Sequence, residues 1–145
     1  MTYSEDTVAP MRDDMTALGF QDLRTPDAVD RFMEEARVGL AMLVVNSVCD
    51  CARSTMRPAL ARALDQPVGP ATLGTVFAGP DGEATSRARE YFTGHSPSSP
   101  AIALFHGGEL VMMVQRPEIK GHHPSLLADE LMAAFRRILG VEVTA

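Results

Sequence analysis

Two cysteines, Cys49 and Cys51, are the residues of this sequence whose type and spacing best suit chemistry. They are the only cysteines among the 145 residues, and one residue, Asp50, separates them. Because a pair this close cannot join distant parts of a fold, a structural disulfide framework is excluded. Three interpretations remain: a reactive dithiol, two ligands of a metal site, and a chance pairing.

The segments on either side of the cysteines favour the reactive dithiol. Residues 40–45 are all apolar, which predicts a strand buried on both faces of a sheet. Residues 52–64 have the spacing of a helix with one buried face, and Pro58 within them predicts a kink. The cysteines therefore lie between a strand and a helix N-terminus, whose free N–H groups and dipole favour a thiolate. A nucleophilic cysteine needs such surroundings.

The remaining segments indicate an α/β domain. Helices are expected near residues 8–18, 26–36, 83–92 and 124–139, and strands at 20–23, 73–78, 101–105 and 110–114. The last two strands flank Gly107-Gly108, a hairpin signal. In the first helix, the predicted buried face consists of Val8, Met11, Met15 and Leu18. Because strands alternate with helices and end in a hairpin, we expect a mixed sheet in a single domain over residues 1–145.

The composition excludes several classes of partner. Lys and Arg total 13 against 19 Asp and Glu, which gives a formal net charge of −6. This balance argues against nucleic-acid binding, which needs a surplus of clustered positive charge. No apolar run reaches the roughly 18 residues of a membrane span, and no signal peptide is recognisable, so a cytoplasmic protein that does not enter membranes is expected.

Five separated motifs resemble those of the bacilliredoxin family, in the same order along nearly the whole chain. They are VVNSVCDC at 44–51, FAG at 77–79, AREYFTG at 88–94, SPSSP at 96–100 and EIKGH at 118–122. Pro10-Met11-Arg12 in the first helix also fits the pattern. The resemblance implies a thioredoxin-like fold: a mixed central sheet with helices on both faces and an extra N-terminal helix. In that fold the proline matching Pro100, preceded by Ser99, is cis and faces the cysteines.

The same resemblance implies a thiol–disulfide oxidoreductase that removes bacillithiol from mixed disulfides on client proteins. Some family members also show disulfide isomerase activity. Cys49 would be the attacking thiol and Cys51 the resolving one, with Asn46, Ser99 and Pro100 shaping the site. Bacillithiol would act as a co-substrate thiol, and no other cofactor is expected; a homodimer is compatible with the sequence. A Cys49–Cys51 disulfide would close a small, strained ring, and strained disulfides are oxidising, which suits exchange better than strong reduction.

Asp50 departs from the family pattern, which mostly has glycine between the cysteines. A neighbouring carboxylate disfavours a second negative charge and would raise the pKa of the thiol. Arg53 could offset that charge, in which case the two residues form a compensating pair. Alternatively, Asp50 could cap the start of the helix.

His122 is the remaining candidate, because the strand after the hairpin returns residues 116–122 to the cysteine end of the sheet. There it could assist proton transfer or favour the thiolate, or it could serve only as a loop or cap residue. Together with His123 and the two cysteines it would also supply a zinc or copper site, which is the main non-enzymatic alternative. A redox-inert interaction protein with the same fold is a second alternative.

Overall fold

The central strand of the computed structural model is β2 (Leu40–Asn46), and every one of its residues is buried. The structure describes residues 4–141. Beside β2 the five-stranded sheet has the order β1 (Gln21–Asp22), β3 (Thr72–Phe77), β2, β4 (Ala101–His106) and β5 (Glu109–Val114). β1, β3 and β2 are parallel, whereas β4 and β5 run antiparallel to their neighbours, so the sheet is mixed as predicted.

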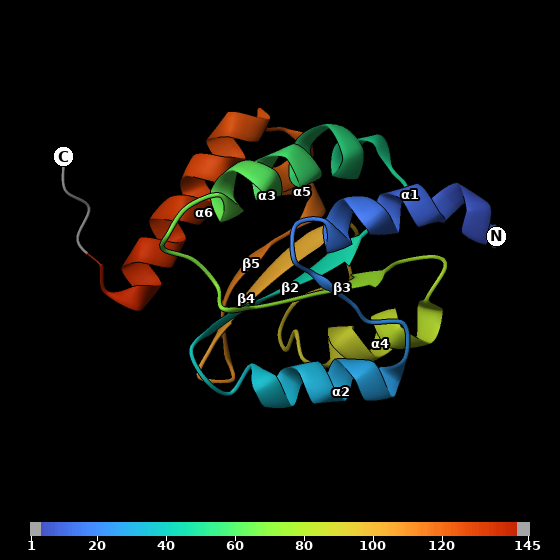
Figure 1. Ribbon diagram of the computed structural model, residues 1–145, viewed down its shortest axis with the longest axis horizontal. Coiled ribbons are helices and arrows are strands. Elements are labelled where there is room, and N and C mark those ends of the chain that lie inside the picture. Colours follow the sequence, from blue (N-terminus) through green and yellow to red (C-terminus); the bar gives the residue numbers. More distant parts are fainter. Residues whose placement is uncertain (1–3, 142–145) are drawn as a thin grey trace.

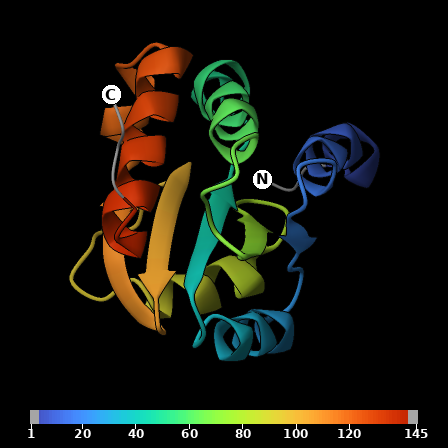
Figure 2. The same cartoon turned by 60° about the vertical axis from the view of Figure 1, so that its left-hand side comes forward.

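Helices cover both faces of this sheet (Figure 1). One face carries η1 (Ala52–Met56), α3 (Arg57–Leu64), α5 (Arg116–Lys120) and α6 (Pro124–Leu139). The other face carries α2 (Pro26–Glu35) and α4 (Gly82–Glu90). The N-terminal helix α1 (Glu5–Thr16) lies on the same side of the sheet as the first group. The turned view shows that it is separated from α3 and α6 (Figure 2).

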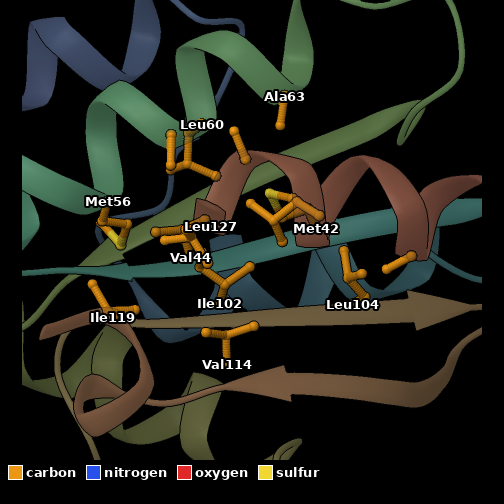
Figure 3. Packing of buried hydrophobic residues seen from close by; sticks show 14 of the residues in the cluster. Met42, Val44, Met56, Leu60, Ala63, Ile102, Leu104, Val114, Ile119 and Leu127 are labelled. Atoms are coloured by element: carbon orange, nitrogen blue, oxygen red, sulfur yellow. The ribbon is translucent and has the colours of Figure 1, made fainter. Parts of the chain in front are cut away.

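The alternation of side chains along β2 divides the core into two clusters. Leu40, Met42 and Val44 pack on the face of α3 and α6, while Ala41, Leu43 and Val45 pack on the face of α2 and α4. In the first cluster, Ile119 of α5 and Met56 of η1 lie beside the strands (Figure 3). The sheet end where β2 stops and β4 starts is therefore backed by packed apolar side chains.

The predicted kink at Pro58 takes a different form. The chain is helical from Asp50, and the irregularity is the π-helical turn η1, which precedes Pro58, while Pro58 lies in the first turn of α3. Proline has no N–H to donate to the carbonyl of Ser54, and its ring would clash with that oxygen. A wider turn just before the proline relieves both problems, and the Arg57 N–H donates to the carbonyl of Ala52 across it.

Two further expectations are corrected by the structure. Residues 116–120, expected only as a return segment, form the short helix α5, which has Pro117 in its first turn and whose Glu118 carboxylate accepts the Gln115 N–H at 3.2 Å. In α1 the buried residues are Val8, Arg12 and Met15, so Arg12 takes the place predicted for Met11. Its burial is possible because carboxylates surround it: Glu5 at 2.9 Å, Asp22 at 3.2 Å and Asp81 at 2.6 Å.

Candidate active site

Cys49 and Cys51 lie at the C-terminal end of β2, where the chain turns into the helix that continues as η1 and α3. The carbonyl of Cys49 accepts the first N–H groups of this helix, from Ala52 at 3.2 Å and Arg53 at 3.4 Å. Cys49 is half-buried and Cys51 is buried, and both are free thiols. Their sulfur atoms are 2.8 Å apart, within hydrogen-bond range. Strand end and helix start thus bring both thiols to one point, as predicted.

The two thiols respond to this environment in opposite directions. Burial opposes ionisation of Cys49, but hydrogen bonds to its sulfur from the Cys51 thiol, the Ser47 hydroxyl and the Ala52 N–H, with the charge of Arg116, lower the pKa of Cys49. Burial raises the pKa of Cys51, and donating its proton toward Cys49 raises it further. Of the two thiols, Cys49, which is the more accessible, is therefore the one that ionises first.

Helix α5 forms the opposite wall of the site. A pocket of about 400 Å³ is lined by the two cysteines, Asp50, Ser54, Thr55, Arg116 and Lys120. Ile119, in the same short helix, is fully buried in the core cluster. This anchor fixes α5 against η1, so that Arg116 and Lys120 border the thiol pocket.

The loop before β4 lies at the same end of the sheet as the two cysteines. The Ser99–Pro100 peptide bond is cis, as predicted, and Pro100 is buried. Since Ala101 pairs with Val45 near the end of β2, Pro100 lies at the cysteine end of the sheet. Ser98 holds the loop in place, because its hydroxyl accepts the Arg116 N–H at 2.8 Å.

Asn46 and Arg57 form a buried polar pair beneath the cysteines. The Asn46 Oδ1 accepts from the Ser47 N–H at 2.9 Å and from Nη1 of Arg57 at 3.1 Å. Burial lowers the pKa of Arg57, while the charges of Asp14 and Cys49 counteract that effect. Asn46 was predicted to shape the site. Arg57 was missed, because a charged residue in the helix after the cysteines is expected on the exposed face of that helix.

Asp50 and Arg53 form an ion pair on the outer surface of the site. Nη2 of Arg53 lies 2.5 Å from Oδ1 of Asp50, and both side chains are well exposed. The Ser54 hydroxyl donates to the carbonyl of Asp50 at 2.7 Å. Within the described residues, the contacts of the Asp50 carboxylate are with side chains: Oδ1 with Arg53, and Oδ2 with the Ser54 hydroxyl at 3.3 Å. The compensating pair is therefore the arrangement present, and the alternative of a simple helix cap is wrong.

The histidines do not join the cysteines. Nδ1 of His122 contacts the carbonyl of Glu118, and Nδ1 of His123 accepts from the Ser125 N–H at 3.2 Å, so both make local contacts. The pocket lining contains Arg116 and Lys120 but neither histidine. Among residues 4–141, no cluster of three or more His, Cys, Asp or Glu could hold a metal ion. The four-residue metal site proposed as an alternative is not assembled here.

The fold and the thiol pair define a thioredoxin-fold protein. A solved protein with a thioredoxin fold aligns with a TM-score of 0.54 at 17% identity, covering 74% of this chain and 89% of that one. Trxlp from Edwardsiella tarda EIB202 aligns with a TM-score of 0.50 at 18% identity, covering 76% and 96%. Within the described residues, no helix has the length and apolar character needed to cross a membrane.

Sequence relatives identify the family. The model of a family described as disulphide isomerase matches residues 3–138. A bacilliredoxin of Koribacter versatilis is 46% identical over 143 residues, covering 99% of this chain and 98% of the relative. A bacilliredoxin of Bacillus cereus is 44% identical over 133 residues, covering 92% and 91%. The chain belongs to the bacilliredoxin family, and with its paired thiols it is a thiol–disulfide oxidoreductase.

Proposed function

We propose that this protein removes bacillithiol from mixed disulfides on client proteins. The Cys49 thiolate attacks the bacillithiol sulfur of the client's mixed disulfide. The bond between that sulfur and the client sulfur breaks as the Cys49–bacillithiol bond forms. The client leaves as a thiolate, takes up a proton and is thereby restored.

Two routes remove bacillithiol from Cys49. In the first, the Cys51 thiol loses its proton and attacks Cys49, which releases bacillithiol as a thiolate and leaves a Cys49–Cys51 disulfide. The client has then gained the two electrons that the dithiol lost. In the second, a free bacillithiol attacks the adduct, so that bacillithiol disulfide leaves and the dithiol returns.

One observation carries the proposal: the half-buried Cys49 is the acidic thiol, and the buried Cys51 sulfur lies 2.8 Å from it. The first step needs an accessible thiolate, and the second needs another thiol within reach that loses its proton after Cys49 has reacted; the pair supplies both. The name of the relatives supports bacillithiol as the co-substrate. A reducing compartment keeps such thiols free, which supports the cytoplasm as the place of action.

The experiment uses a client peptide that carries bacillithiol on its one cysteine, with release followed by mass spectrometry. Cys49→Ser should abolish release, because a hydroxyl does not replace a thiolate near neutral pH. Cys51→Ser should permit the first exchange and accumulate a Cys49–bacillithiol adduct. Full release by both variants would contradict the proposal and favour a redox-inert protein.

The family description favours a second activity, the isomerisation of protein disulfides. An isomerase attacks a client disulfide with Cys49 and lets another client thiol displace it, so it needs no net oxidant. Cys51→Ser should therefore retain the refolding of a test protein with scrambled disulfides. Absence of refolding by the reduced wild-type protein would exclude this activity.

A further inference from the structure

A second pocket adjoins the thiol pocket, and one residue belongs to both. It has a volume of about 580 Å³ and is lined by Arg89 at the end of α4, by residues 96–99, and by Gln115, Arg116 and Pro117. Arg116 also lines the pocket of Cys49 and lowers the pKa of that thiol. A group bonded to the Cys49 sulfur therefore has this second pocket beside it.

Hydrogen bonds build the pocket in advance of any ligand. The Arg116 N–H donates to the Ser98 hydroxyl at 2.8 Å, and Nε2 of Gln115 donates to the carbonyl of Ser96 at 3.3 Å. Nη2 of Arg89 reaches the carbonyl of Ser98 at 3.4 Å. These contacts tie α4, the cis-proline loop and the start of α5 together, so the walls are preorganised.

Two buried polar atoms of these walls have no partner. Among residues 4–141, Nε of Arg89, a donor, and Oε1 of Gln115, an acceptor, are buried without a hydrogen bond. Within the same residues, neither Arg89 nor Arg116 forms an ion pair, so both guanidinium groups are available to an anion. Buried polar groups are normally satisfied, so the unmet donor and acceptor in these walls are groups that a bound molecule or an ordered water would complete.

We propose that this pocket binds the acidic part of the small thiol that becomes attached to Cys49. The ligand is a low-molecular-weight thiol with a carboxylate, which accepts from Arg89 and Arg116, and with an N–H or O–H group that donates to Oε1 of Gln115. The inference rests on the proposed function, because that reaction places the small thiol, not the client, on Cys49. Arg89 is then a specificity-determining residue 40 positions after Cys49 in sequence.

The test compares two mixed disulfides that differ in one charge. A one-cysteine peptide is joined either to N-acetylcysteine, which has a carboxylate and an N–H, or to its neutral amide. The rate of peptide release by the full reduced protein is measured for each. Wild type should prefer the carboxylate probe, and Arg89→Gln should lose about tenfold on it while keeping its rate on the amide probe, since hydrogen bonds to charged groups are the stronger ones.

Arg89→Gln is preferred to a change at Arg116, because Arg116 also acts on the thiol pKa. The pH dependence of thiolate absorbance should be the same for Arg89→Gln and wild type. Arg62→Gln, which removes an exposed charge at the far end of α3, is the matched control and should leave both rates unchanged.

Equal losses on both probes would mean that Arg89 only supports the loop through Ser98, and would overturn the inference. So would a loss that follows an acidic residue placed in the peptide instead of the carboxylate of the small thiol. Failure of wild type to release bacillithiol from a client peptide would contradict the proposed function separately, since the comparison of the two probes does not use bacillithiol.

Discussion

At the scale of single residues, the division of labour between Cys49 and Cys51 depends on which thiol donates to the other. Either sulfur could donate across the 2.8 Å contact, but once Cys49 ionises the Cys51 thiol is the donor, so the contact lowers the pKa of Cys49 and raises that of Cys51. Burial works against ionisation of both, but only Cys49 has the added help of Ser47 and of the Ala52 N–H. Ionisation is thereby favoured at the sulfur that solvent and substrate can reach.

This asymmetry predicts the pH dependence of alkylation. The alkylation rate of Cys49 should be half-maximal at a pH lower than the pKa of a free cysteine, which is about 8.5, and that of Cys51 at a higher pH. Iodoacetamide at mildly acidic pH should therefore label Cys49 first, as peptide mass spectrometry can show. Preferential labelling of Cys51 would reverse the two roles.

The lowered pKa also predicts a linkage to stability. A folded state that favours the Cys49 thiolate gains stability above the unfolded pKa and loses it as pH falls through the folded pKa. The raised pKa of Cys51 acts in the opposite sense: its contribution is complete below the unfolded pKa and lost as pH rises through the folded one. Reduced Cys51→Ser has no second titrating thiol, and its hydroxyl can still donate to Cys49, so its stability should rise as pH increases from 7 to 9 in urea titrations (roughly the range set by free thiol pKa values).

The ion pair of Asp50 and Arg53 predicts a compensating pair of effects. Asp50→Gly leaves Arg53 unpaired beside the site and should lower the pKa of Cys49, whereas Arg53→Gln leaves Asp50 unpaired and should raise it. Each shift should be roughly half a unit, because exposed charges are screened by water. The double variant should return to the wild-type pKa, measured by thiolate absorbance against pH. A double variant whose Cys49 pKa departs from wild type by as much as that of either single variant would contradict the compensation.

At the scale of elements, α5 matters most, because one apolar side chain holds it in place. Ile119 is fully buried while Arg116 and Lys120 of the same helix border the thiols. A five-residue helix has little stability of its own, so the packing of Ile119 in the core holds α5 in position. The electrostatics of Cys49 therefore depend on the core through Ile119.

Ile119→Ala should cost about 2–5 kcal/mol of unfolding free energy and Ile119→Val about 0.5–1.5 kcal/mol. Because the alanine variant loosens α5, Arg116 should also move from Cys49, and the thiol pKa should rise. Urea unfolding and thiolate absorbance measure the two effects. A stability loss of the expected size with an unchanged pKa would show that Arg116 is positioned by the Ser98 contact instead.

At the scale of the whole molecule, Arg12 connects parts of the chain that are far apart in sequence. Its guanidinium reaches Glu5 in α1, Asp22 in β1 and Asp81 before α4, and it lies over the ring of Phe77 at 5.4 Å. Hydrogen bonds to Asp81 raise the pKa of Arg12, against the opposing effect of burial. α1 is thus attached to the edge of the sheet by a buried ion network.

Arg12→Met should destabilise the protein by about 3–5 kcal/mol, because Asp22 and Asp81 would lose their common partner in a buried setting. Arg24→Met removes a half-exposed partner of Asp22 and Glu5 and should cost about 1 kcal/mol or less. Urea unfolding compares the two variants. Equal losses of unfolding free energy in the two variants would show that burial does not strengthen the ion pairs of Arg12.

The sequence by itself determined the parts of this protein that neighbouring residues specify. The apolar run of β2 has a local pattern that predicts a central strand, and the spacing of Cys49 and Cys51 predicts a site at its end. Pro100, in its motif, was correctly expected to be cis at that end. Only the tertiary structure decided which charged residues surround the thiols. Arg57 and Arg116 come from two elements, Arg89 of a third lines the adjoining pocket, and His122, expected near the thiols, contacts the carbonyl of Glu118. The physical reason is that a charged side chain carries no hydropathy signal for its burial or its partner, since both depend on how distant elements pack.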